Sequence, residues 1–222
     1  MPLARINLFE EAKKITQPFL VVDLADVDDF VARLFISQGM VAWHKHIDEE
    51  QLFLVLDGEL TLETEWGNNV LRSGEVAVIP KAVTHRCGSV VRTVALVFER
   101  KFFANRQNGQ RRLFALKGEG KITPVSIGAE AVQLEEPSVS QQLVTVDDLA
   151  LSLVRYGNKP EERRCSRASE LLMVQDGSLR LESELGSATL EKAEMTVVPK
   201  GVKYRGTAVE KAIVLLVTKG AP

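Results

Sequence analysis

The sequence predicts an all-β protein built from two copies of one domain. Short runs of Val, Leu, Ile, Phe and Thr are separated by turn residues such as Asp-Gly, Arg-Ser-Gly and Pro-Lys about every eight to twelve residues, which is the spacing of strands in a β-sandwich or barrel. In addition, the second half of the chain repeats the first at a fixed offset. Both halves should therefore adopt the same fold.

The repeat has an offset of 119 residues and contains no gap between residues 52 and 86, where 16 of 35 positions are identical to the residues 119 positions later. Residues 6–100 correspond in this way to residues 125–219. The sequence therefore predicts an N-terminal domain, a connector and a C-terminal domain over residues 1–105, 106–124 and 125–222.

The pattern of apolar residues predicts the elements of each copy. A short helix is expected only at residues 8–15, where Phe9 and Ala12 share one face. The run LFLVL at residues 52–56 is apolar on both faces, as is VAVI at 76–79, so both strands should be covered on both sides. The run TLETEW at residues 61–66 alternates, so one of its faces should meet water.

Composition indicates an ordinary soluble protein. The chain is 45% hydrophobic and 26% charged, with a formal net charge of −2, which gives no global attraction to nucleic acid or acidic membranes. No apolar stretch approaches the roughly 18 residues of a membrane span, and the N-terminus lacks the apolar core of a signal peptide. We therefore expect a cytoplasmic protein in which Cys87 and Cys165, far apart in the sequence, are thiols.

The chain contains only three histidines, and two of them are separated by one residue. In an extended strand His44 and His46 point to the same side, about 7 Å apart, so both imidazoles can bind a single ion. The third, His85, follows Pro80 by five residues.

This arrangement resembles the cupin superfamily. Its first motif is matched by Gly39, His44, His46, Gln51 and Gly58, and its second by Gly74, Pro80, Ala82 and His85. The resemblance implies two tandem double-stranded β-helix (jelly-roll) barrels, a bicupin, in which the lumen of the first barrel holds one divalent metal ion. The implied ligand positions are His44, His46, His85 and Gln51.

Gln51 departs from the family pattern, which has a carboxylate there. An amide oxygen is a neutral and weaker ligand, so the site would keep a larger positive charge. Three alternatives follow: three histidines with Gln51 as fourth ligand or neighbour, a shifted site that uses Glu50, and a degraded site that binds metal poorly. Strand alternation turns Glu50 away from the lumen unless the turn shifts by one residue.

The second copy has no histidine at the corresponding positions, which are occupied by Arg163, Cys165, Glu170 and Tyr204. A guanidinium cannot bind a metal ion and repels it, so we expect a degenerate second site without metal. These side chains are expected to pair inside the second barrel as structural groups. The alternative is a small-molecule pocket anchored by Arg163 and Tyr204.

Other residues are candidates for the wall of the first cavity. Phe35 and Phe53 are expected to make it apolar, Cys87 should lie near the metal, and Arg33 could hold a substrate carboxylate if it points inward. The connector is basic, and we interpret it as a solvated linker.

The resemblance implies a metalloenzyme that acts on a small anionic organic molecule, of the dioxygenase, isomerase, decarboxylase or lyase type. The alternative is a non-catalytic small-molecule or metal-binding module. The motifs do not distinguish Fe, Mn, Ni, Cu and Zn. Two copies in one chain would mimic the homodimer of single-domain relatives, so the expected state is a monomer acting as a pseudo-dimer, or a homodimer, with no nucleic-acid or membrane partner.

Overall fold

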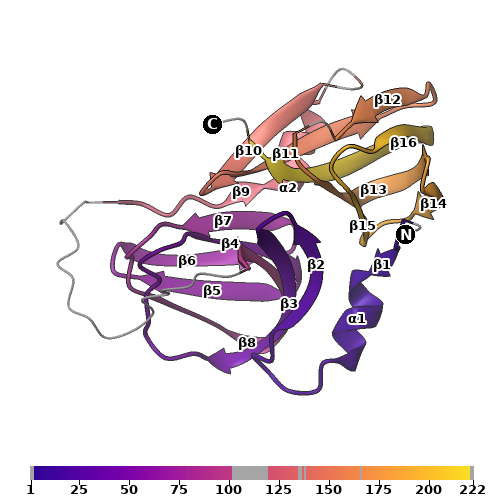
Figure 1. Ribbon diagram of the computed structural model, residues 1–222. Helices are drawn as coiled ribbons and strands as arrows, with labels where there is room; N and C mark the ends of the chain where they lie inside the picture. Colours follow the sequence, from indigo (N-terminus) through magenta and orange to yellow (C-terminus); the bar gives the residue numbers. More distant parts are fainter. Residues whose placement is uncertain (1–2, 102–119, 135–136, 138, 166, 221–222) are drawn as a thin grey trace. The chain divides into compact units, whose positions relative to one another are not determined.

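The computed structural model describes residues 3–101, 120–134, 137, 139–165 and 167–220. It divides the chain into two compact units (Figure 1): an N-terminal unit of Ala12–Leu24 and Asp29–Ser126, and a C-terminal unit of Met1–Glu11, Ala25–Asp28 and Ile127–Pro222. The described residues form mostly strands, together with the helices α1 (Leu8–Lys14) and α2 (Ile127–Val132). The all-β prediction is confirmed, and α1 confirms the helix predicted at residues 8–15. The expectation of a helix only there was wrong, because α2 lies at the equivalent positions of the repeat.

The N-terminal sheet is antiparallel, with the strand order β2-β3-β8-β4-β7-β9 and with β5 joining β8 to β6. The longest strand of this sheet, β8, pairs with β5 through its first residues, with β4 through its second half and with β3 along most of its length. One strand therefore connects both parts of the barrel wall. The strands are β2 (Val22–Val27), β3 (Phe30–Met40), β4 (Gln51–Asp57), β5 (Glu59–Thr64), β6 (Gly67–Arg72), β7 (Glu75–Ile79), β8 (His85–Arg100) and β9 (Val125–Ser126).

The C-terminal sheet repeats this design, with the order β1-β15-β13-β16-β11-β10, and with β12 on β16 and β14 on β13. Strand β16 corresponds to β8 and pairs with β11, β12 and β13. The strands are β1 (Ile6–Asn7), β10 (Ser140–Val146), β11 (Leu149–Tyr156), β12 (Glu161–Arg164), β13 (Glu170–Ser183), β14 (Gly186–Leu190), β15 (Glu194–Val198) and β16 (Lys203–Lys219).

The two copies exchange their first strands. Strand β1 joins the C-terminal sheet by pairing with β15, and its equivalent in the repeat, β9, joins the N-terminal sheet by pairing with β7. Asn7 strengthens the first pairing, because its amide donates to Glu194 while its oxygen caps α1. Residues 3–11, which the sequence assigns to the first domain, therefore belong to the C-terminal unit. The predicted boundary at residue 105 and most of the connector lie outside the described residues.

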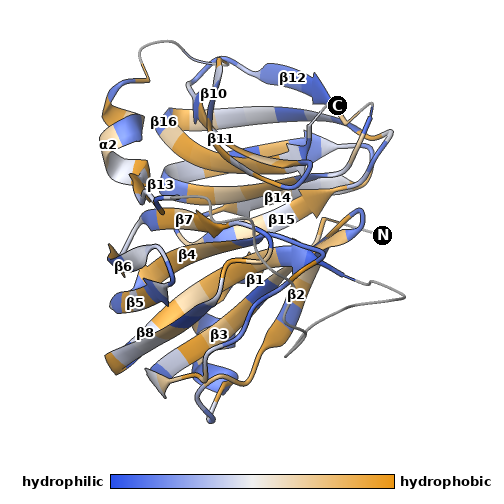
Figure 2. Cartoon of the chain, turned by 90° about the vertical axis from the view of Figure 1, so that its left-hand side faces the viewer, coloured by the Kyte–Doolittle hydropathy of each residue, from blue (hydrophilic) through white to orange (hydrophobic). Residues whose placement is uncertain are grey.

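Each unit encloses its own apolar core. In the N-terminal unit the core includes Phe35, Phe53 and Cys87, and in the C-terminal unit it includes Tyr156 and Tyr204. Figure 2 shows hydrophobic residues concentrated on the strands and hydrophilic residues at loops and strand ends. Among the described helices, none has the length and hydropathy needed to cross a membrane.

The repeated Asp-Gly pair marks a place where only glycine fits. Gly58 has a φ of +91°, and a Cβ there would lie 2.5 Å from Oγ1 of Thr93. At the equivalent Gly177, with φ of +79°, a Cβ would lie 2.2 Å from the carbonyl oxygen of Lys211. Both values exclude a side chain, which explains why the pair persists in both copies.

Candidate metal centre

The three histidines converge in the N-terminal unit. Each offers one nitrogen, and these nitrogens all lie within 4.8 Å of one another. The expected strand at His44 is reduced to a single bridge, in which His44 and His85 exchange backbone hydrogen bonds of 2.9 and 2.8 Å. Residues paired in this way point to the same side, and the His44 and His85 ring centres are 4.4 Å apart. The carbonyl of His46 accepts from the backbone N–H of Ala82 at 2.7 Å, which anchors the third imidazole.

Two of the imidazoles are oriented by backbone carbonyls. Nδ1 of His44 lies 2.9 Å from the carbonyl oxygen of Ala42, and Nδ1 of His85 lies 2.9 Å from that of Val83. A carbonyl can only accept, so each Nδ1 carries the proton and each Nε2 keeps its lone pair. Neutral imidazoles that are held in place and have an unprotonated Nε2 atom are suitable ligands for a divalent transition metal.

The ring nitrogens of His46 are buried beside a carboxylate. Neither of its ring nitrogens has a hydrogen-bond partner among the described residues, while Nδ1 lies 3.3 Å from Oε1 of Glu49. A buried imidazole without hydrogen bonds is costly, and a bound cation would satisfy it. His46 also groups with Glu49 and Glu99 in a second set of ligand atoms within 4.8 Å of one another.

Gln51 lies beside His85. It begins β4 opposite Ile79, and its Oε1 is 3.1 Å from Nε2 of His85. Glu50, the alternative in the shifted arrangement, belongs to neither group of clustered ligand atoms among the described residues. The geometry therefore brings Gln51 to the histidines.

The sequence alone assigns no role to Glu49 or to Glu99. Both are buried, with exposed fractions of 7% and 1%. Glu99 could have been found from alternation, because it follows Ala95 and Val97, which face the core, at intervals of two residues. Glu49 precedes its strand, and no periodicity marks it.

The aromatic residues predicted for the cavity wall lie in the apolar core of the N-terminal unit. The Phe35 and Phe53 rings pack edge to face with centres 6.3 Å apart, and Phe19 stacks on Phe35 at 6.5 Å. Cys87 belongs to the same core cluster, and burial raises the pKa of its thiol to about 12. Cys87 is therefore a neutral packing group at physiological pH.

Arg33 is engaged by protein carboxylates. Its Nε donates to Asp23 at 2.6 Å, and its Nη1 donates to Glu99. Substrate binding by Arg33 stays a prediction, and its contacts indicate a role in holding Glu99.

In the C-terminal unit the equivalent positions form a polar cluster. Tyr204 donates from its hydroxyl to Glu170 at 2.7 Å, and Nε of Arg163 lies 3.9 Å from the same carboxylate oxygen. Cys165 is buried, and burial raises the pKa of its thiol to about 12. The carbonyl of Cys165 accepts from Gly201 at 2.6 Å, as that of His46 accepts from Ala82. The backbone of the site is thus repeated with different side chains.

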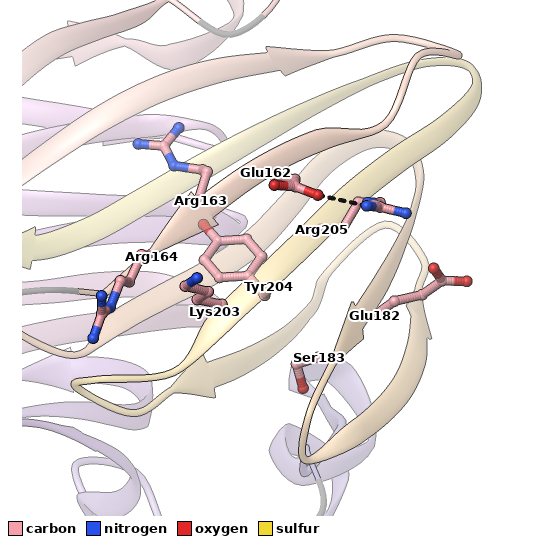
Figure 3. A pocket seen from close by; sticks show the side chains of 8 residues that line it. All are labelled: Glu162, Arg163, Arg164, Glu182, Ser183, Lys203, Tyr204 and Arg205. Atoms are coloured by element: carbon pink, nitrogen blue, oxygen red, sulfur yellow. Dashed lines mark hydrogen bonds and ion pairs between the residues drawn. The ribbon is translucent and has the colours of Figure 1, made fainter.

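A cavity of about 610 Å³ opens on this unit (Figure 3). Of the four predicted lumen residues only Arg163 and Tyr204 line it, and Glu162 pairs with Arg205 across the strands. Its walls are Glu162, Arg163, Arg164, Glu182, Ser183, Lys203, Tyr204 and Arg205.

Burial of His85 predicts a pH dependence of the metal-free protein. Desolvation lowers the pKa of His85 to about 4, from an ordinary value of 6.5. The unfolded chain therefore binds this proton first as the pH falls, and stability should decline from about pH 6.5 until about pH 4, by a total on the order of 3 kcal/mol. Urea unfolding of wild type and His85→Gln at several pH values measures the effect. Equal pH slopes for the two proteins would contradict it.

Comparisons with known proteins agree with the resemblance of the sequence to the cupin superfamily. A model of the cupin domain family matches residues 34–98, which include all three histidines and Gln51. The uncharacterized protein YdbB of Bacillus subtilis is 35% identical over 96 residues, which are 43% of this chain and 85% of that protein.

Solved structures extend the likeness to both units. A cupin 2 conserved barrel domain protein from Leptotrichia buccalis is 14% identical, with a TM-score of 0.73. The match covers 99% of this chain and 98% of that protein's chain. A salicylate 1,2-dioxygenase from Pseudaminobacter salicylatoxidans is 13% identical, with a TM-score of 0.73, and covers 98% of this chain and 84% of its own. Such identities show a shared fold. Together with the family model and the B. subtilis relative, they show that this chain belongs to the cupin superfamily.

Proposed function

We propose that the N-terminal unit binds one divalent metal ion on His44, His46 and His85, with the amide oxygen of Gln51 beside them. The observation that supports this most is that the chain's only three histidines place their ligand atoms within 4.8 Å of one another. Fe, Mn, Ni, Cu or Zn would supply Lewis acidity there, and the redox-active metals would add one-electron chemistry.

We further propose a metalloenzyme that acts on a small anionic organic molecule. Three neutral imidazoles and a neutral amide leave the charge of an ion uncompensated by its ligands, which favours a carboxylate substrate. Phe35 and Phe53 provide an apolar wall that keeps water away from the reacting groups. The structurally similar salicylate 1,2-dioxygenase has been solved as an adduct with gentisate, so small aromatic acids are the first substrates to test.

The second candidate is a non-catalytic metal-binding or small-molecule-binding module. It is favoured by the contacts of the two buried acids beside the histidines, because Glu49 lies against His46 and Glu99 against Arg33. Neither acid is placed as a general base, and a reaction that needs one would have to obtain it from the substrate or solvent.

Metal content tests the binding proposal directly. Protein purified without a histidine tag should contain about one transition-metal ion per chain by mass spectrometry. Removal of the ion with a chelator should lower the melting temperature, because a ligand that binds only the folded state stabilises it. Protein that neither contains nor takes up metal would exclude the metalloenzyme and a metal-binding module, and would leave a small-molecule-binding module.

Oxygen consumption separates the two candidates. Protein loaded with Fe²⁺ should consume oxygen with salicylate or gentisate if it is a dioxygenase. If NMR shows that such acids are converted in the absence of oxygen, the protein is of the isomerase, decarboxylase or lyase type. Stoichiometric metal with neither conversion nor oxygen uptake over a broad panel of carboxylic acids would favour the non-catalytic module.

A further inference from the structure

A row of hydrogen-bonded polar side chains leads from His85 toward the surface. The amide of Gln51 contacts His85 through Oε1 at 3.1 Å and donates from Nε2 to Oε2 of Glu99 at 2.9 Å. The other oxygen of Glu99 accepts from Arg33, and Arg33 also donates to Asp23 at 2.6 Å. Gln51 and Glu99 are each only 7% exposed, so both depend on the hydrogen bonds of their neighbours.

This row fixes the direction of the Gln51 amide. A carboxylate can only accept, so Glu99 binds the NH₂ group of Gln51 and leaves Oε1 facing His85. The Nε2 atom of His85 also carries a lone pair, because its Nδ1 is committed to the carbonyl of Val83. Two acceptors therefore face each other at 3.1 Å, an arrangement that a cation between them would stabilise.

The distance agrees with this explanation. Two neighbouring ligands that each lie about 2.1 Å from one ion are about 3 Å apart in octahedral geometry and about 3.4 Å apart in tetrahedral geometry, and the observed 3.1 Å lies between these values. In the second copy the equivalent contact is made by Tyr204 and Glu170, where a hydroxyl donates to a carboxylate at 2.7 Å. That pair is satisfied by its own proton, whereas the pair in the first copy is not.

The two copies of the repeat have a carboxylate on different strands of the same strand pair. In the C-terminal unit Glu170 pairs with Thr218 across β13 and β16. The equivalent positions in the N-terminal unit are Gln51 and Glu99, which face each other because Leu52 pairs with Phe98 next to them. Each barrel therefore has one carboxylate at this pair of opposed positions, on β13 in one copy and on β8 in the other.

We infer that Glu99 supplies the negative charge that Gln51 lacks, and that it positions the Gln51 amide so that Oε1 faces the metal ion. Arg33, held by Asp23, keeps the Glu99 carboxylate in place. Glu99 is in this sense a positioning residue that acts on the ion through Gln51. The inference rests on the metal site proposed above and assigns a function to a residue outside both cupin motifs.

Four proteins test it: the wild type, Glu99→Gln, Gln51→Glu, and the exchanged pair Gln51→Glu/Glu99→Gln. The exchanged pair moves the carboxylate next to His85 and keeps an amide between it and Arg33, so both hydrogen bonds can persist. Co²⁺ is the probe, with affinity measured by competition with a chelator and coordination followed by the visible absorption bands. The melting temperature of each metal-free protein is measured in parallel.

Glu99→Gln should weaken Co²⁺ binding by about 10–100-fold, the usual effect of groups that hold metal ligands, and should change the visible bands. The exchanged pair should bind Co²⁺ at least as tightly as the wild type. Gln51→Glu should bind tightly but should lower the melting temperature of the metal-free protein, because two carboxylates then face each other.

Glu63→Gln is the matched control. Glu63 also pairs with an arginine of the N-terminal unit, Arg86, at 2.7 Å, and its replacement should leave Co²⁺ affinity unchanged. If the wild type binds Co²⁺ and Glu99→Gln binds it with the same affinity, the role of Glu99 is overturned and the metal site remains. If the wild type does not bind Co²⁺, the metal site and the role of Glu99 are both overturned. If Glu99→Gln does not fold, the exchanged pair decides, because binding more than about tenfold weaker than wild type would show that position 51 does not face the ion.

Discussion

Replacing His85 by alanine is expected to abolish stoichiometric metal binding. His85 is only 1% exposed and its ring centre lies 4.4 and 5.7 Å from those of His44 and His46, so its Nε2 is one of three imidazole nitrogens that a single ion can share. Two histidines and a neutral amide should bind a divalent ion at least about a hundredfold more weakly, since even groups that only orient a ligand are worth 10–100-fold. Metal content by mass spectrometry, and the loss of the metal-dependent rise in melting temperature, measure this effect.

The repeat offers a control for this variant. Tyr204 occupies the position equivalent to His85 in the second copy, and Tyr204→Phe should leave the metal content at the wild-type value. Circular dichroism of metal-free His85→Ala checks that the protein remains folded without the contact to Val83. A folded His85→Ala protein that still carries one ion per chain would show that the ligand set is wrong.

The sequence is sufficient for the fold and for the position of the histidines because both depend on local patterns. Strand alternation places His44 and His46 on one side, and the distance of His85 from Pro80 matches a family motif. The structure adds the backbone bridge between His44 and His85, which explains why two residues 41 positions apart in the sequence present their rings together.

The position of Glu99 could not be predicted in the same way. Alternation places Glu99 on the core face of its strand, but its contact with Gln51, 48 residues away, depends on the register between β4 and β8. Such pairings between distant strands leave no local periodicity in the sequence. The exchange of β1 and β9 was missed for a related reason, because each is only two residues long and pairs through its backbone.

The second barrel illustrates the same limit. The sequence shows that the second copy lacks the histidines, but it does not show which side chain occupies part of the lumen instead. Tyr156 is fully buried and lies against Gly206, where a Cβ would be 2.4 Å from Cε1 of the ring. The equivalent residues of the first copy are Ser37 and Cys87. The second copy therefore has a large and a very small residue, Tyr156 and Gly206, where the first copy has two small residues.

This complementarity predicts strong coupling between positions 156 and 206. Gly206→Cys should destabilise the C-terminal unit by about 1–3 kcal/mol, because the new side chain overlaps the Tyr156 ring. Tyr156→Ser should cost about 3–5 kcal/mol, the usual effect of removing a buried aromatic ring. The double variant, which restores the residues of the first copy, should cost less than the sum of the two by about 0.5–3 kcal/mol. Urea unfolding followed by far-ultraviolet circular dichroism gives these values.

Tryptophan fluorescence provides the control within the same molecule. The only tryptophans, Trp43 and Trp66, both lie in the N-terminal unit, so their unfolding transition should shift less than the dichroism transition in every variant. Metal content should also be unchanged, because the three histidines belong to the N-terminal unit. Two outcomes would show that the Tyr156 ring does not depend on the space above Gly206. One is that the effects of the two substitutions on stability are additive. The other is that Gly206→Cys lowers the free energy of unfolding by less than about 0.5 kcal/mol, as at an ordinary surface position. In that case the absence of histidines alone would distinguish the second lumen from the first.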